Sequence, residues 1–173
     1  MVRYVLAVAV CMFGAMAPAE ASVLVSVDTY SQQMTVTVNG NLLYNWPVST
    51  GRQGYATPSG SFRPFRMERE HFSREWDEAP MPHSIFFTER GHAIHGTGST
   101  GALGRPVSHG CVRLAPGNAA RLFSLVQEHG LAETEVEIIG GSFAGDSNIL
   151  PSVVGGAPPH LDIDRFIRLL DGG

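Results

Sequence analysis

The stretch VLVSVDTYSQQMTVTVNGNLLYNWPVS, residues 23–49, shows the pattern that decides the fold. Apolar and polar residues alternate over 23–28 and again over 33–38, which is typical of strands with one buried face. Asn39-Gly40 supplies a two-residue hairpin turn, and 42–49 is predicted as the returning strand, with Pro47 at an edge or bulge. Three consecutive short strands favour a β-rich fold.

Other short elements follow along the chain. Apolar runs predict strands at 84–88, 93–94 and 135–139, and the glutamates at 133, 135 and 137 are expected on one solvated strand face. The clearest helix lies at 118–129, where apolar residues form a stripe and Gly130 is the stop signal. The glycine-rich segment 96–104 is predicted to be a loop. These elements together predict a β-rich α+β domain with one main helix.

The polar stretch 66–80 interrupts this pattern without a clear period of its own. It is predicted to be a long surface excursion or lid with at most one helical turn. Phe72 and Trp76 are expected to pack under this lid, with a place in a substrate groove as the alternative.

Length and composition limit the classes of protein to consider. The chain has 173 residues, of which 43% are hydrophobic and 16% charged, as expected for one globular domain. A formal net charge of −4 argues against nucleic acid as a partner. All 12 basic residues are arginine, which excludes Schiff-base chemistry, a phosphate-binding Walker lysine and a Ser-Lys dyad.

The two ends of the chain differ from its middle. Residues 1–21 combine Arg3, an apolar run and Ala19-Glu20-Ala21, an order typical of a secretory signal peptide. The apolar run is shorter than the roughly 20 residues that a membrane span needs. The sequence therefore predicts a signal peptide at 1–21, a domain at 22–140 in the periplasm or cell envelope with no stable membrane anchor after cleavage, and a Gly/Pro-rich tail with a short helix at 141–173.

Signal cleavage would leave one cysteine, Cys111. Its retention in an exported protein indicates either a functional thiol or a buried apolar side chain. A histidine from a separate strand, such as His95, can activate a thiol, and a backbone carbonyl would suffice to orient that imidazole. Backbone N–H groups near Gly110 and Cys111 are candidates for an oxyanion hole. Arg113 lies two residues after Cys111 and therefore on the same face of an extended segment, where it would bind a carboxylate or lower the thiol pKa.

These segments resemble the L,D-transpeptidases of the YkuD type. The resemblance rests on His95-Gly96-Thr97 with the later box Ser-His-Gly-Cys-Val-Arg at 108–113, supported by TPSGSF at 57–62 and MPHSIFF at 81–87. It covers roughly 23–139 and departs from the family pattern at His83, where tyrosine is usual. It implies a mixed β-sandwich or barrel with the helix at 118–129 packed on it, and neither a cofactor nor a metal.

The resemblance also implies acyl transfer on peptidoglycan tetrapeptide stems. Cys111 would be the nucleophile and His95 the general base and acid, and a stem amine would resolve the thioester to a 3-3 cross-link. A free D-amino acid, a lipoprotein lysine or water would be alternative acceptors, with water giving carboxypeptidase activity. The residues implied to shape the oxyanion site or bind substrate are Met81, His83, Gly96, Thr97, Ser108, His109, Gly110 and Arg113.

Two other classes of protein stay open on the sequence. His92, His95, His109 and Cys111 are all zinc-ligand types, so a zinc-dependent cell-wall peptidase is one alternative, although no H-E-x-x-H or paired C-x-x-C is present. A non-catalytic wall-binding domain is the other. Within the cysteine site, His109 is an alternative base, an oxyanion donor or a structural residue, and His92 is predicted to be an exposed polar residue at a strand start.

Overall fold

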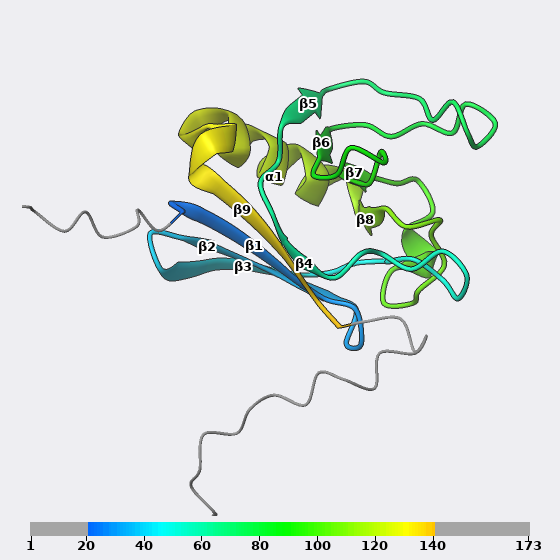
Figure 1. Ribbon diagram of the computed structural model, residues 1–173, viewed down its shortest axis with the longest axis horizontal. Coiled ribbons are helices and arrows are strands. Elements are labelled where there is room, and N and C mark those ends of the chain that lie inside the picture. The colour runs from blue at the N-terminus through cyan, green and yellow to red at the C-terminus, as the bar shows by residue number, and fades with distance from the viewer. Residues whose placement is uncertain (1–20, 141–173) are drawn as a thin grey trace, which may run out of the picture. The chain divides into compact units, whose positions relative to one another are not determined.

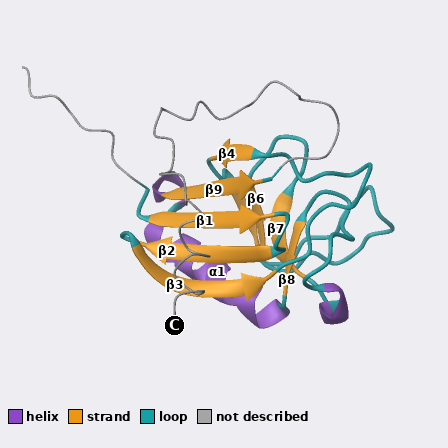
Figure 2. Ribbon diagram, turned by 90° about the horizontal axis from the view of Figure 1, so that it is seen from below, coloured by secondary structure: helices purple, strands orange, loops and turns teal. Residues whose placement is uncertain are grey.

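The computed structural model describes residues 21–140, which form two sheets and one long helix (Figures 1 and 2). The five-stranded sheet has the order β3-β2-β1-β9-β4 and the four-stranded sheet the order β5-β6-β7-β8. The strands are β1 (Val23–Asp28), β2 (Gln33–Val38), β3 (Asn41–Pro47), β4 (Gly60–Phe62), β5 (Arg66–Glu68), β6 (Ser84–Phe86), β7 (Ala93–Gly96), β8 (Val112–Leu114) and β9 (Thr134–Ile139). The helix α1 spans Pro116–His129, and the short 3-10 helices η1 and η2 span Thr100–Ala102 and Leu131–Glu133.

One continuous apolar core joins both sheets to α1. The inward residues of β1, at 23, 25 and 27, are fully buried and alternate with partly exposed ones, as strands with one covered face require. Figure 2 shows α1 behind the five-stranded sheet, on the side where β7 and β8 lie. From α1 the core receives Ala119, Leu122, Phe123 and Val126, while Ile94 of β7 and Val112 of β8 belong to the same cluster. The second sheet is therefore held rigidly against the first.

The fold confirms the predicted β-rich α+β class with one main helix. The Asn39-Gly40 hairpin is present, with both residues at positive φ (50° and 76°), the conformation that this two-residue turn requires. The helix begins at Pro116, two residues earlier than predicted, because proline has a fixed φ and needs no N–H partner in the first helical turn.

Two further details differ from the sequence prediction. The first three residues of the stretch 66–80 pair with β6 as β5, and residues 74–78 form a hydrogen-bonded turn and no helix. Glu133 lies in η2 rather than on a strand, whereas Glu135 and Glu137 are half-buried on the outer face of β9.

The predicted signal peptide and tail lie outside the described residues, apart from Ala21 at the start of the described range. Among the residues that the structure does describe, no helix is long and apolar enough to cross a membrane.

The packing of α1 against the sheets predicts that Leu122 contributes strongly to the stability of the fold. Leu122 is fully buried in the core, so Leu122→Ala should lower the free energy of unfolding by about 3 kcal/mol through lost contacts and the cavity left behind. The control is Leu42→Ala on β3, where the side chain is 65% exposed and the change should be within about 0.5 kcal/mol. Urea unfolding of both variants measures the difference, and equal losses would contradict the packing described here.

Candidate active site

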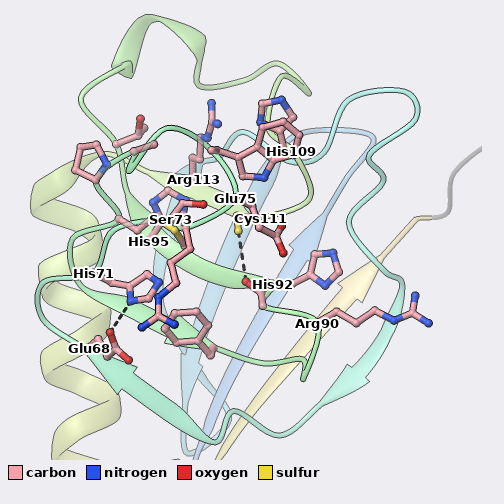
Figure 3. Close-up of a pocket in the computed structure, with 18 of the residues that line it drawn as sticks. Glu68, His71, Ser73, Glu75, Arg90, His92, His95, His109, Cys111 and Arg113 are labelled. Carbon is pink, nitrogen blue, oxygen red and sulfur yellow. Dashed lines mark hydrogen bonds and ion pairs between the residues drawn. The ribbon is translucent and has the colours of Figure 1, made fainter.

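Two neighbouring parallel strands, β7 and β8, bring the histidine motif and the cysteine motif together. In their register His95 is the partner of Arg113. Partners across a parallel pair share a face of the sheet, and so do residues two apart in an extended segment. Cys111, one residue before β8, therefore faces the same way as Arg113 and His95, and all three line one cleft (Figure 3).

His95 is a buried imidazole with a defined tautomer. Its Nδ1 donates to the Gly96 carbonyl oxygen (2.8 Å), which leaves Nε2 as the proton acceptor. The prediction that a backbone carbonyl is enough to orient this ring is confirmed. Burial lowers the pKa of His95 to about 4, opposed by the bond to Gly96 and assisted by the cation of Arg113. His95 is therefore neutral at physiological pH and able to accept a proton.

The space around residue 96 explains why a glycine follows His95. A Cβ at Gly96 would lie 3.2 Å from the Pro82 side chain and 3.3 Å from the Ala119 Cβ. The Gly96 N–H also donates to the Pro82 carbonyl oxygen (2.8 Å). Gly96 thus lets β7 approach both α1 and the segment before β6, and this contact holds the carbonyl that orients His95.

Cys111 rests as a protonated thiol. Its Sγ makes a long contact of 3.9 Å with the Gly91 carbonyl oxygen (Figure 3). Burial raises the pKa of the thiol above its ordinary value, while the Ala93 backbone hydrogen bond and the charge of Arg113 lower it and the carboxylate of Glu75 raises it. The sequence-based expectation of a lowered thiol pKa is wrong for the resting site. Arg113 does lower this pKa, but removal of the thiol from water outweighs the effect of that cation.

The loop before Cys111 is fixed by its own hydrogen bonds. The Ser108 hydroxyl donates to the Cys111 carbonyl oxygen (2.5 Å) and accepts from the Gly110 N–H (3.1 Å). The Thr57 hydroxyl, from the TPSGSF segment, donates to the Gly110 carbonyl oxygen (2.9 Å). The Gly110 N–H is therefore engaged within the loop, and the predicted oxyanion hole cannot use it without breaking this bond.

Gly110 itself permits a close approach of His92. Gly110 has φ of +113°, and a Cβ there would lie 2.8 Å from the His92 ring. His92 is half-buried, and its Nδ1 is bonded to the Thr88 hydroxyl (2.7 Å). His92 is thus a packed residue of the cleft wall and not the exposed polar residue predicted at a strand start.

The loop after β5 covers the cysteine end of the cleft. Trp76 stacks on the imidazole of His109, with ring centroids 3.6 Å apart and planes 10° from parallel. Tyr55 meets both rings edge-on. The cleft below has a volume of about 810 Å³. Trp76 therefore belongs to the lid and also lines the groove, whereas Phe72 is 57% exposed and does not pack beneath the lid as predicted.

The predicted site residues divide into two groups. Met81, His95, Thr97, His109, Cys111 and Arg113 line the cleft. Gly96, Ser108 and Gly110 do not line it. The two glycines permit close backbone approach, and the Ser108 hydroxyl holds the loop before Cys111. The Thr97 hydroxyl accepts a bond from the Ser99 N–H (3.2 Å) and so fixes the turn that follows β7.

His83 is the one predicted substrate contact that points elsewhere. Its backbone has a positive φ of 55°, and its ring packs edge-on against Phe123 of α1. The His83 N–H donates to the Arg69 carbonyl oxygen (2.8 Å). This turn directs the side chain to the helix, and His83 is not among the residues that line the cleft.

Sequence reasoning missed several residues of the cleft wall. Glu68, His71 and Glu75 line the cleft together with Tyr55. Glu68 and His71 form a contact of 2.5 Å between Oε2 and Nδ1. The separation of three residues between a glutamate and a histidine is a weak signal for this pair, but a stretch without regular period gives no reason to place the pair in the cleft that Cys111 lines.

The zinc alternative has no donor set in the described part of the chain. Within residues 21–140, no group of three or more His, Cys, Asp and Glu side chains is arranged to hold a metal ion. His92, His95, His109 and Cys111 share the cleft, but His109 is stacked under Trp76 and His92 is bonded to Thr88.

Comparison with known proteins identifies the class to which this fold and cleft belong. The sequence model of the YkuD family, the L,D-transpeptidase catalytic domain, matches residues 22–138. The chain therefore belongs to the L,D-transpeptidase family.

Individual relatives agree with this assignment. YkuD of Bacillus subtilis (strain 168) is 24% identical over 105 residues, 59% of this chain and 59% of that protein. An L,D-transpeptidase from Mycobacterium smegmatis superposes with a TM-score of 0.63 at 27% identity, over 69% of this chain and 59% of its own. An L,D-transpeptidase from Stackebrandtia nassauensis gives 0.62 at 28% identity, over 76% and 62%. The chain thus spans less than two thirds of the length of each of these proteins.

The charges around Cys111 predict its reactivity. Because burial raises its pKa, the rate of alkylation by iodoacetamide should rise with a midpoint above the ordinary thiol value of about 8.5. Arg113→Gln removes a cation and should move the midpoint higher, while Glu75→Gln removes an anion and should move it lower. Mass spectrometry over a pH series gives the rates, with Cys111→Ala as the blank for alkylation elsewhere. A midpoint below about pH 8 in the parent would contradict the neutral thiol.

The buried neutral imidazole predicts a loss of stability in acid. His95 titrates at about 4 in the folded protein, against an ordinary 6.5 in the unfolded chain. Between these values the unfolded state binds more protons, so the free energy of unfolding falls as the pH is lowered from 6.5 to 4, by roughly 3 kcal/mol. His95→Gln lacks this group and should lose correspondingly less over the same window. Urea unfolding at pH 7, 5.5 and 4 compares them, and parallel losses would refute the assignment.

Proposed function

We propose that this protein is an exported cysteine L,D-transpeptidase that acts on peptidoglycan stem peptides. One observation carries the proposal: His95 and Cys111 line the same cleft, and the Gly96 carbonyl fixes His95 with Nε2 free to accept a proton. A thiol, an oriented base and a cleft wide enough for a peptide are the parts that nucleophilic acyl transfer requires.

The first half of the reaction begins from a neutral pair. The Cys111 Sγ attacks the carbonyl carbon between the L-centre of diaminopimelate and the terminal D-Ala of a tetrapeptide stem. His95 takes the thiol proton as the S–C bond forms and then gives it to the leaving amine, so that D-Ala departs and a thioester remains. Because both groups rest uncharged, proton transfer accompanies the attack and no thiolate is stored beforehand.

The surrounding residues support this step in different ways. Ser108 and Gly110 hold the nucleophile loop, which leaves the amide of Cys111 as our candidate for the oxyanion donor. Arg113 places a fixed positive charge on the face that Cys111 shares and would orient a stem carboxylate. Met81, Thr97 and His109 form parts of the wall against which the stem would lie.

The second half of the reaction needs an acceptor. A stem amine would give a 3-3 cross-link, a free D-amino acid would give exchange, a lipoprotein lysine would give protein anchoring, and water would give L,D-carboxypeptidase activity. We place this activity in the periplasm or cell envelope, because residues 1–21 have the order of a signal peptide. N-terminal sequencing of the protein from the envelope fraction should find Ser22, and a start at Met1 there would instead show a retained anchor.

A solved relative suggests a covalent probe for the nucleophile. The structure of L,D-transpeptidase LdtMt1, 25% identical over 68% of this chain with a TM-score of 0.60, is a complex with imipenem. We infer that imipenem acylates Cys111 here, since its strained amide would mimic the stem carbonyl.

The deciding experiment uses the purified protein with defined tetrapeptide muropeptides, the products being read by mass spectrometry. Cys111→Ser and His95→Gln should each lower turnover by at least about 100-fold, the lower range for loss of a general base or nucleophile. His109→Gln tests the alternative base and, because this ring is stacked on Trp76, should keep turnover within about tenfold. A shift of intact mass after imipenem treatment should appear in the parent and be absent from Cys111→Ser.

Three results would overturn this assignment. Turnover that survives Cys111→Ser excludes the thiol, and turnover lost to a chelator would restore a metal-dependent peptidase. Loss of turnover in His109→Gln with retention in His95→Gln would reverse the roles of the two histidines.

A further inference from the structure

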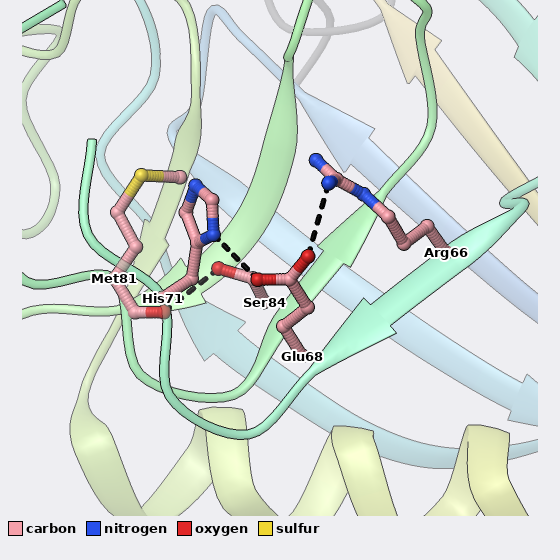
Figure 4. Close-up of polar contacts among 5 residues, drawn as sticks. All are labelled: Arg66, Glu68, His71, Met81 and Ser84. Atoms are coloured by element: carbon pink, nitrogen blue, oxygen red, sulfur yellow. Dashed lines mark hydrogen bonds and ion pairs between the residues drawn. The ribbon is translucent and has the colours of Figure 1, made fainter. Parts of the chain in front are cut away.

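A second oriented imidazole lies in the same cleft. His71 follows β5, and its Nδ1 is 2.5 Å from Oε2 of Glu68 (Figure 4). The other carboxylate oxygen of Glu68 accepts from Arg66 Nη1 (3.0 Å). The Arg66 guanidinium in turn lies over the ring of Phe86, 3.7 Å from its centroid. The three side chains form a linked row, Arg66-Glu68-His71.

The contacts of this row fix the orientation of the His71 imidazole. A carboxylate only accepts, so the Nδ1 of His71 carries a proton toward Glu68, and in the neutral ring Nε2 is the acceptor. The ring stands edge-on against Phe86 (5.0 Å between centroids), and the His71 carbonyl oxygen accepts from the Met81 N–H (2.7 Å). His71 therefore has the same tautomer as His95 and is held by backbone and side-chain contacts.

His71 is also placed where a substrate can reach it. It lines the cleft together with His95 and Cys111, and 21% of its side chain is exposed. In Figure 3 Glu68 lies on the side of His71 away from Cys111, so that the orienting carboxylate does not block the cleft. The first half of the reaction, as proposed above, uses neither His71 nor Glu68.

In the second half of the reaction the acceptor amine must lose two protons, and His95 alone does not take up both. An aliphatic amine reaches the cleft as an ammonium ion, because its pKa lies well above neutrality. It must lose one proton before it can attack and a second proton as the amide forms. His95 is needed for the second proton, and with Nδ1 bonded to the Gly96 carbonyl it has one free ring nitrogen, so it cannot hold both protons at once.

We propose that His71, oriented by Glu68, accepts the first proton from the acceptor ammonium; this inference rests on the proposed transpeptidase function. The acceptor R–NH₃⁺ gives one proton to His71 Nε2, and the free amine attacks the thioester carbon. The C–N bond forms and the C–S bond breaks. His95 takes the second proton from nitrogen and passes it to the Cys111 sulfur, and His71 returns its proton to water. His71 is then a catalytic residue of aminolysis, and Glu68 is its positioning residue.

The test measures how the acyl-enzyme divides between amine and water. The purified protein is given a tetrapeptide donor with D-methionine, whose amine is largely protonated at pH 7, and the ratio of exchanged to hydrolysed product is read by mass spectrometry. This ratio is set after the thioester has formed and does not depend on the rate of acylation. His71→Gln should lower it about 100-fold, the lower end of general-base contributions. Glu68→Gln keeps the shape but not the charge and should lower it less.

A second acceptor separates proton transfer from damage to the site. Hydroxylamine is uncharged at neutral pH and needs no base to release a proton before attack, so parent and His71→Gln should partition equally with it. His129→Gln is the matched control, since His129 lies at the end of α1 with its ring bonded to Ser22 (3.3 Å). It should leave both ratios unchanged.

The outcomes discriminate between the two proposals. An equal loss with D-methionine and hydroxylamine would show that His71 only shapes the cleft, and an unchanged D-methionine ratio would show that it has no part in aminolysis. Either result overturns this inference while leaving the transpeptidase assignment standing. Failure of the parent to form any acyl-enzyme, with imipenem or with the donor, overturns both.

Discussion

The parallel pairing of β7 with β8 is the constraint on which the rest of the site depends. It sets His95 opposite Arg113 and places Cys111 beside the start of β7, so that residues from two distant motifs share a face. A shift of one residue in this register would turn His95 away from the thiol. The pairing is secured outside the second sheet as well, because Ser49 and Arg113 exchange two backbone hydrogen bonds (2.9 and 3.0 Å). The segment that follows β3 of the first sheet therefore holds β8, the strand that begins directly after Cys111, in place.

Burial then decides the protonation state of the pair. Desolvation disfavours a charged thiol and a charged imidazole alike. At Cys111 it outweighs the Ala93 backbone hydrogen bond and the cation of Arg113, and at His95 it outweighs the hydrogen bond to Gly96. Cys111 and His95 therefore both stay uncharged until a substrate binds and the thiol proton is transferred. A single fixed cation, Arg113, remains on the shared face and disfavours a proton on His95 while favouring an anion at Cys111. Its charge thus opposes protonation at both partners.

Much of the fold and part of the site followed from the sequence. The alternation in β1 and β2, the Asn39-Gly40 turn and the stripe of α1 are local signals, and each predicted its element correctly. The motifs around His95 and Cys111 predict that these two residues share a site, and both line the same cleft. The orientation of His83 depends on a positive φ, and the commitment of the Gly110 N–H depends on where the Ser108 hydroxyl points. The raised pKa of Cys111 depends on burial by segments far away in sequence, which no local pattern shows.

The two walls of the cleft have different origins in the chain. The wall that holds Cys111, His95 and Arg113 is built from the motifs at 95–97 and 108–113 and sits on the paired strands β7 and β8. The opposite wall comes from the loop 69–80 and β5, which supply Trp76, His71 and Glu68. Stacking of Trp76 on His109 joins these walls directly beside the nucleophile. In the reaction proposed here, bond cleavage uses the first wall and the acceptor amine is activated from the second. Variation confined to the loop 69–80 is therefore expected to change the product without changing the nucleophile.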